Sequence, residues 1–108
     1  MKRIVLFAAI LLLSQFTFAQ DSGWSTTSTV KRIVITANGG VNVYLHPELQ
    51  GCESQSGYGS GYASIYPSHP GIDRLLSSLL VAKTTKTPIQ LYFTDNKCTA
   101  VEMIQHDG

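Results

Sequence analysis

Apolar and polar residues alternate with a period of two in several short stretches of the chain, and this alternation predicts β-strands. In residues 41–45, for example, the two valines and the leucine point to one side, and Asn42 and Tyr44 point to the other. A run of β-branched residues over 30–36 also favours extended backbone, and the segment 38–40, Asn-Gly-Gly, suits a hairpin turn. Five strands are expected, at residues 30–36, 41–45, about 62–66, 89–93 and 100–105.

One stretch has the periodicity of an amphipathic helix. Between Gly71 and Lys83 the apolar residues recur at intervals of three and four, which places them on one face. Pro70 suits the start of this helix, whereas Thr84 and the threonines after it, followed by Pro88, favour its end. The apolar stripe consists of Ile72, Leu75, Leu76, Leu79 and Leu80.

The order of three strands, one helix and two strands predicts an α+β fold that is mainly β. The helix must lay its leucine stripe on the sheet, because no other element can cover it. This order matches a five-stranded OB-like Greek-key barrel, and an open antiparallel sheet with one packed helix is the alternative. Residues 20–29 are polar and are expected to form a loose lead-in, with Trp24 folding back onto the edge of the core.

The first residues have the three-part pattern of a secretory signal peptide. Lys2 and Arg3 precede an apolar run over residues 4–13, and the small residues Thr17 and Ala19 then stand at the −3 and −1 positions of a cleavage site. The apolar run is too short to span a bilayer, which needs roughly 20 residues. We therefore expect cleavage after Ala19, so that residues 1–19 are removed and a single exported domain, residues 20–108, remains.

The charge balance argues against a nucleic-acid partner. The chain has 8 Lys and Arg against 7 Asp and Glu; without Lys2 and Arg3 there are six basic residues and no basic run. Proteins that bind nucleic acids need basic patches to offset phosphate repulsion. We therefore expect no nucleic-acid partner for this protein.

Both cysteines, Cys52 and Cys98, lie in the expected exported domain. An even number of cysteines in a small exported chain predicts a disulfide, and their separation fits no zinc-binding pattern. A bridge would add stability to a domain that has a small core. Two separate buried thiols are the alternative.

No catalytic or metal-binding constellation is recognisable. His46, His69 and His106 lack the spacing of zinc ligands and are expected in solvated loops. The serines form no nucleophile elbow, and the carboxylates are scattered along the chain. We expect a protein that is not an enzyme and that uses no metal and no cofactor; a small hydrolase would need a site assembled only by the fold.

The tyrosines are the candidates for a ligand-binding surface. Tyr62 and Tyr66 are four residues apart, so in a strand they share a face, and Ala63 and Ile65 face the core. Tyrosine combines a flat apolar ring with a polar tip, which suits sugars and partner proteins. The alternative is that the rings only pack over the faces of the sheet. The predicted ligand-binding residues are Tyr44, Tyr62, Tyr66 and Tyr92, with Tyr58 nearby in glycine-rich chain.

Several of these segments resemble a family of small secreted proteins from Gram-negative bacteria, most of whose members have no assigned function. The resemblance rests on LLSSLLVAKTTKTPIQLYFTDNKC, on the upstream GGVNVYL, on Trp24 and on Cys52. The element order and the cysteine pair also resemble the OB-fold binding subunits of bacterial toxins, such as the pertussis and subtilase classes, although a fold does not fix a function.

The resemblance implies an exported, toxin-subunit-like binding module for a glycan or for an envelope or host protein, in the periplasm or outside the cell. A further implication is that copies of the protein assemble into a homo-oligomer through the edges of their sheets. A monomeric periplasmic protein with a structural or inhibitor-like role is the alternative. No sugar-binding motif carries over residue by residue.

Overall fold

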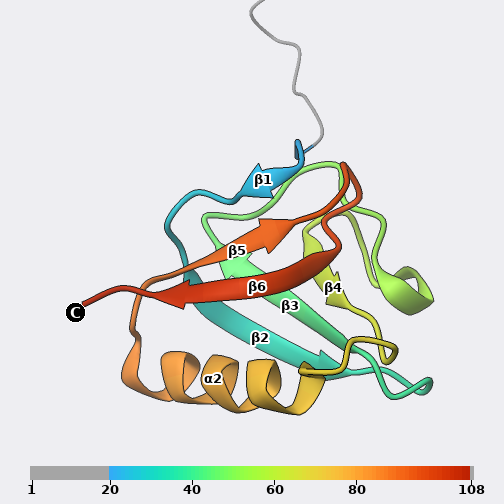
Figure 1. Ribbon diagram of the computed structural model, residues 1–108. Helices are drawn as coiled ribbons and strands as arrows, with labels where there is room; N and C mark the ends of the chain where they lie inside the picture. Colours follow the sequence, from blue (N-terminus) through green and yellow to red (C-terminus); the bar gives the residue numbers. More distant parts are fainter. Residues whose placement is uncertain (1–19, 108) are drawn as a thin grey trace, which may run out of the picture.

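The computed structural model describes residues 20–107, and the signal peptide predicted for residues 1–19 lies outside them. Within the described part, the chain forms two antiparallel three-stranded sheets and one long helix (Figure 1). Among residues 20–107, we find no helix with the length and hydrophobicity of a membrane span. The elements are β1 (Gly23–Trp24), β2 (Thr29–Ile35), β3 (Val41–His46), the 3-10 turn η1 (Gln55–Gly57), β4 (Tyr62–Ile65), α2 (Ile72–Thr85), β5 (Ile89–Phe93) and β6 (Ala100–Gln105).

The strands are ordered β2-β3-β4 in one sheet and β1-β5-β6 in the other. Figure 1 shows the β5–β6 hairpin in front of β2 and β3, with α2 below both sheets. Two isolated bridges join the sheets, because Ser28 pairs with Ile89 and Ser64 pairs with Thr99. The α+β class is therefore confirmed. The strands are not closed into one barrel, so the predicted five-stranded OB-like barrel is unconfirmed.

The hydrophobic core lies between the two sheets and the helix. Leu45 of β3 and both Leu91 and Phe93 of β5 are fully buried, as the alternation predicts. Leu79 of α2 is also fully buried, and the helix packs against β2 and β6. The leucine stripe therefore does cover the sheets, although Leu80 at its margin stays 48% exposed.

The helix is longer than predicted at its C-terminal end. Thr84 and Thr85 belong to its last turn, and their hydroxyls donate to the carbonyls of Leu80 and Val81, both at 2.8 Å. These bonds satisfy the threonine side chains inside the helix, so threonine does not end it. The helix ends at Thr85, and the next residue, Lys86, caps it with a left-handed backbone at a φ of 55°.

Residues 20–29 are not a loose lead-in, because β1 pairs with the edge of β5. Ser25 is buried, and its Oγ accepts a hydrogen bond from the backbone N–H of Leu91 at 3.0 Å. Hydrogen bonds to a free strand edge order this polar segment, and hydrophobic periodicity cannot reveal them. Trp24 does return to the domain, where its ring packs edge-on against Tyr92 at 5.2 Å between centroids.

A buried polar cluster covers the outer face of β3. Asn42 lies on the face opposite the valines, as predicted, but η1 covers it and it is fully buried. Its Nδ2 donates to the carbonyl of Gln55, and the Gln55 Nε2 donates to the carbonyl of Ile65, both at 2.9 Å. Ser64 Oγ also donates to Asn42 Oδ1 at 2.7 Å. These bonds fix the loop before β4 against the sheet, beside Tyr62.

The predicted disulfide between Cys52 and Cys98 is present, with a Cα–Cα distance of 5.2 Å. Both residues are buried. The bridge joins the loop that follows β3 to the turn between β5 and β6. It therefore holds the glycine-rich loop of one sheet against the other sheet.

Asp95 organises the turn that carries Cys98. Its Oδ1 accepts hydrogen bonds from the backbone N–H groups of Lys97 at 2.9 Å and of Thr99 at 3.1 Å. Its Oδ2 accepts a hydrogen bond from the Thr99 hydroxyl at 2.7 Å. Desolvation acts to raise the pKa of Asp95, but the hydrogen bonds from Thr99 and Lys97 outweigh it, so the pKa is lowered.

Replacing Asp95 by alanine is expected to lower the free energy of unfolding by about 1–2 kcal/mol at pH 7, because hydrogen bonds to a carboxylate are lost. A carboxyl group with a lowered pKa in the folded state stabilises the fold above its ordinary pKa of about 4. That contribution is lost as the pH falls through the lowered pKa. Urea denaturation should therefore show the difference shrinking between about pH 5 and about pH 2. A difference that stays constant over this range would contradict the role of the charge.

Candidate binding surface

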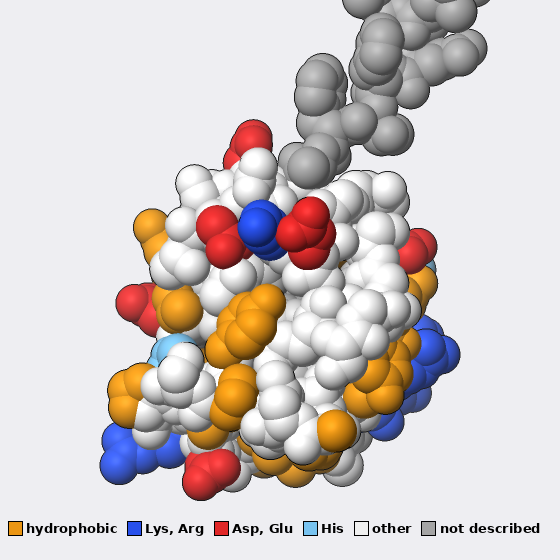
Figure 2. All heavy atoms as spheres, turned by 90° about the vertical axis from the view of Figure 1, so that its right-hand side faces the viewer, with side chains coloured by type: hydrophobic (Ala, Val, Ile, Leu, Met, Phe, Trp, Pro, Cys, Tyr) orange, Lys and Arg blue, Asp and Glu red, His pale blue; other side chains and the backbone are white. Residues whose placement is uncertain are grey.

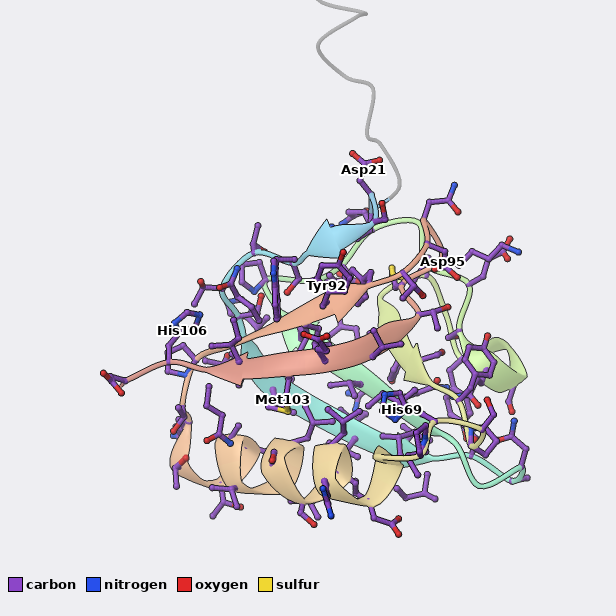
Figure 3. All side chains as sticks on the ribbon, in the orientation of Figure 1. Asp21, His69, Tyr92, Asp95, Met103 and His106 are labelled. Carbon is purple, nitrogen blue, oxygen red and sulfur yellow. A yellow bond between two sulfur atoms is a disulfide. The ribbon has the colours of Figure 1, made fainter. Side chains whose placement is uncertain are left out.

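The structure divides the four predicted binding tyrosines among three places. Tyr44 and Tyr62 lie opposite each other on β3 and β4, with a centroid distance of 5.2 Å. Tyr92 lies on β5 of the other sheet, as Figure 3 shows, beside Trp24. Tyr66 follows the last residue of β4, so it does not share a strand face with Tyr62. The four residues therefore do not form one surface.

Tyr66 leaves the strand because the chain turns directly after β4. Its carbonyl accepts a hydrogen bond from the backbone N–H of His69 at 3.0 Å. Pro67 follows and has no N–H to donate to a neighbouring strand. Tyr66 is 38% exposed.

Tyr44 and Tyr62 belong to a group that also contains Tyr58 and Arg32, and we call these four residues the tyrosine cluster. The Tyr58 ring lies 5.9 Å from the Tyr62 ring, and the rings meet edge to face. Arg32 Nη1 donates a hydrogen bond to the Tyr62 hydroxyl at 2.7 Å. The guanidinium carbon of Arg32 is 5.4 Å from the centre of the Tyr44 ring, a cation–π distance.

The tyrosine cluster has a buried centre and an exposed rim. Tyr62 is only 8% exposed, whereas Tyr58 is 50% exposed. Tyr44 is half-buried and Arg32 is exposed. On the face drawn in Figure 2, hydrophobic side chains form separate areas, one of them beside Lys and Arg side chains at the right-hand edge. Tyrosine and arginine are among the residue types that are enriched at the hot spots of protein interfaces.

Local backbone features bring Arg32 and Tyr58 to the cluster, and the strand pattern did not reveal either. A β-bulge just before Arg32 shifts the register of β2, so that Arg32 stands opposite Tyr44 on the outer face. Gly57 has a positive φ of 66°, which lets the loop turn and bring Tyr58 onto Tyr62. The Gly-rich composition before β4 was the available signal for such a turn.

The ionisable groups of the cluster are tyrosine hydroxyls, which are neutral at pH 7, and the positively charged Arg32 guanidinium. Desolvation raises the pKa of the Tyr44 hydroxyl, and the nearby Glu48 carboxylate raises it further. The hydrogen bond with Tyr62 raises the pKa of Arg32. The cluster therefore offers phenol hydroxyls, aromatic faces and the positive charge of Arg32, with the Glu48 carboxylate beside Tyr44.

The three histidines do not converge. His46 is exposed at the end of β3, but His69 and His106 are half-buried rather than solvated as expected. His69 Nδ1 accepts a hydrogen bond from the N–H of Gly71, and its Nε2 lies 2.9 Å from a carbonyl of β6. His106 Nε2 lies 2.8 Å from Gln90 Oε1. Polar groups of neighbouring segments thus immobilise these two rings, which Figure 3 shows far apart.

Residues 20–107 contain no group of three or more histidine, cysteine or acidic side chains arranged to hold a metal ion.

No protein-family model, curated protein or solved structure matches the chain. The resemblance to secreted proteins of Gram-negative bacteria and to toxin subunits therefore stays a prediction.

Proposed function

We propose that this protein is an exported binding module without catalytic activity and that it recognises a glycan through the tyrosine cluster. The observation that carries the proposal is the contact among Tyr44, Tyr58, Tyr62 and Arg32 on the outer face of a sheet. These side chains lie outside the hydrophobic core. Aromatic rings can stack on the apolar faces of sugars, while their hydroxyls and the guanidinium bond sugar hydroxyls.

Within the α+β class, we propose more specifically that the strands have an OB-like arrangement. The isolated bridges Ser28–Ile89 and Ser64–Thr99 support this description, because they bring the start of β5 beside β2 and the start of β6 beside β4. OB folds bind oligosaccharides on the face of their second and third strands. In this numbering those strands are β3 and β4, which carry Tyr44 and Tyr62.

Export is supported by the disulfide, because such bridges persist in oxidising compartments such as the periplasm or the outside of the cell. The proposal of a binding role, rather than catalysis, is supported by the state of the histidines. Both ring nitrogens of His69 are occupied by neighbouring backbone groups, so neither is free to act as a base.

The test is retention of the oxidised full-length protein on an immobilised panel of glycoprotein, glycolipid and bacterial polysaccharide sugars. Tyr58→Ala is expected to weaken retention about ten-fold, the effect of losing one hot-spot side chain. Tyr66→Ala is the matched control, because Tyr66 is exposed but lies outside the cluster, and it should bind like the parent. Equal losses in the two variants, or no retention of the parent on any sugar, would contradict the proposal.

A protein partner is the second candidate, and unpaired strand edges favour it. Within the described residues, β2 forms a ladder only with β3, and β6 forms one only with β5. An unpaired edge can accept a strand from another protein or from a second copy of the chain. A single stoichiometric protein recovered with the chain from a cell-envelope fraction, with no retention on sugars, would favour this structural or inhibitor-like role. A closed ring in native mass spectrometry would favour a homo-oligomer.

A further inference from the structure

A second surface, separate from the tyrosine cluster, is a basic pocket between β2 and the end of α2. Its volume is about 330 Å³, which lies within the range of roughly 300–1,000 Å³ that is usual for ligand pockets. The lining contains three lysines and no acidic residue. The pocket is lined by Thr29, Val30, Lys31, Lys83 and Lys86.

Two departures from regular backbone place lysines at this pocket. Lys31 is the extra residue of the bulge in β2, because its two neighbours pair with consecutive residues of β3. Because of the bulge, Lys31 lines the pocket, whereas the next residue, Arg32, stands opposite Tyr44 in the tyrosine cluster. Lys86 ends α2 in the left-handed region, where glycine or asparagine is usual. Backbone exceptions of this kind concentrate at functional sites.

The helix dipole alone does not account for the cluster of charges. It favours Lys83 and Lys86 near the C-terminal end of α2, but Lys31 comes from a strand. Within residues 20–107 the one salt bridge joins Lys97 to Glu53, so no acidic side chain pairs with the three lysines of the pocket. Three positive charges also exceed the partial charge of roughly −0.5 at the end of a helix. The pocket is therefore attractive to an anion.

We propose that this pocket binds a phosphate group, either as inorganic phosphate or as a phosphate monoester carried by a sugar. A phosphate monoester has a charge of about −1.5 to −2 and three acceptor oxygens, which suits a pocket lined by three lysines. The Thr29 hydroxyl, whose own bond to the His46 carbonyl is long at 3.4 Å, supplies a further donor at the rim. A carboxylate offers less charge and fewer acceptor atoms to the same donors.

The test is a titration of ¹⁵N-labelled, oxidised full-length protein with inorganic phosphate, glucose 6-phosphate and glucose at low ionic strength. Saturable amide shifts are expected for phosphate and glucose 6-phosphate at residues 29–31 and 83–87, and none for glucose. Tighter binding of glucose 6-phosphate would identify a sugar-borne phosphate, and equal affinity would identify free phosphate. Rising salt should weaken the binding, because the charges are accessible to counterions.

Matched lysine variants distinguish a pocket from general positive charge. Lys31→Gln is expected to weaken phosphate binding about five-fold, and Lys31→Gln combined with Lys83→Gln more than ten-fold. Lys97→Gln is the control, since Lys97 is exposed and pairs with Glu53 elsewhere. Tyr58→Ala should also leave phosphate binding unchanged, so the two surfaces are tested separately. No saturable shifts up to about 20 mM phosphate, or an equal loss in Lys97→Gln, would overturn the proposal.

Discussion

Replacing Cys52 and Cys98 together by alanine is expected to lower the free energy of unfolding by about 4 kcal/mol. The bridge joins residues 46 positions apart, and closing a loop of this length removes a corresponding part of the entropy of the unfolded chain. Small domains have only about 5–15 kcal/mol of stability in total. The double variant should therefore unfold at a much lower temperature and a much lower urea concentration than the oxidised parent.

Urea and thermal denaturation followed by circular dichroism measure this effect. The parent protein kept reduced by excess dithiol is the control and should lose a similar amount of stability. Intact mass should show the oxidised parent two hydrogens lighter than the reduced form. A double variant that unfolds at the same urea concentration as the oxidised parent would contradict the stabilising role of the disulfide.

The second large effect is expected in the helix, where two adjacent leucines differ in burial. Leu79 is fully buried and Leu80 is 48% exposed. Leu79→Ala should lower the free energy of unfolding by about 2–5 kcal/mol, because it leaves a cavity between α2 and the sheets. Leu80→Ala removes the same atoms from the same helix and should change stability by less than about 1 kcal/mol. The helix propensity change is equal in both variants, so their difference isolates packing.

Chemical denaturation of the two variants side by side checks this prediction. Equal destabilisation would show that α2 does not pack with the orientation described. A loss confined to Leu79→Ala would confirm that the helix covers the core between β2 and β6.

The parts of the fold that could be predicted from the sequence are those specified by periodic burial. The leucine stripe had to face the sheets because a helix of this length has one apolar side, and Leu79 is buried as expected. The alternation over 89–93 likewise corresponds to buried Ile89, Leu91 and Phe93. Two cysteines in a small domain could pair in only one way, and they do.

The parts that the sequence could not predict depend on hydrogen bonds between distant segments. Gln55 is polar, so the sequence pattern does not predict that it is buried over β3. Its burial depends on hydrogen bonds from its Nε2 to carbonyls of β3 and β4. The polar segment around Ser25 is ordered by the edge of β5. The candidate site shows the same limit, because the bulge that turns Arg32 towards Tyr44 has no signature in the alternation of β2.

Amide shift mapping tests most directly whether the tyrosine cluster is the glycan-binding surface that we propose. The sugar that the panel retains most strongly is added to ¹⁵N-labelled, oxidised full-length protein. We predict that the largest shifts occur at Arg32, Tyr44, residues 57–59 and Tyr62. Shifts centred on Tyr92 and Trp24 of the other sheet, or on the helix, would place the binding surface elsewhere and contradict the account.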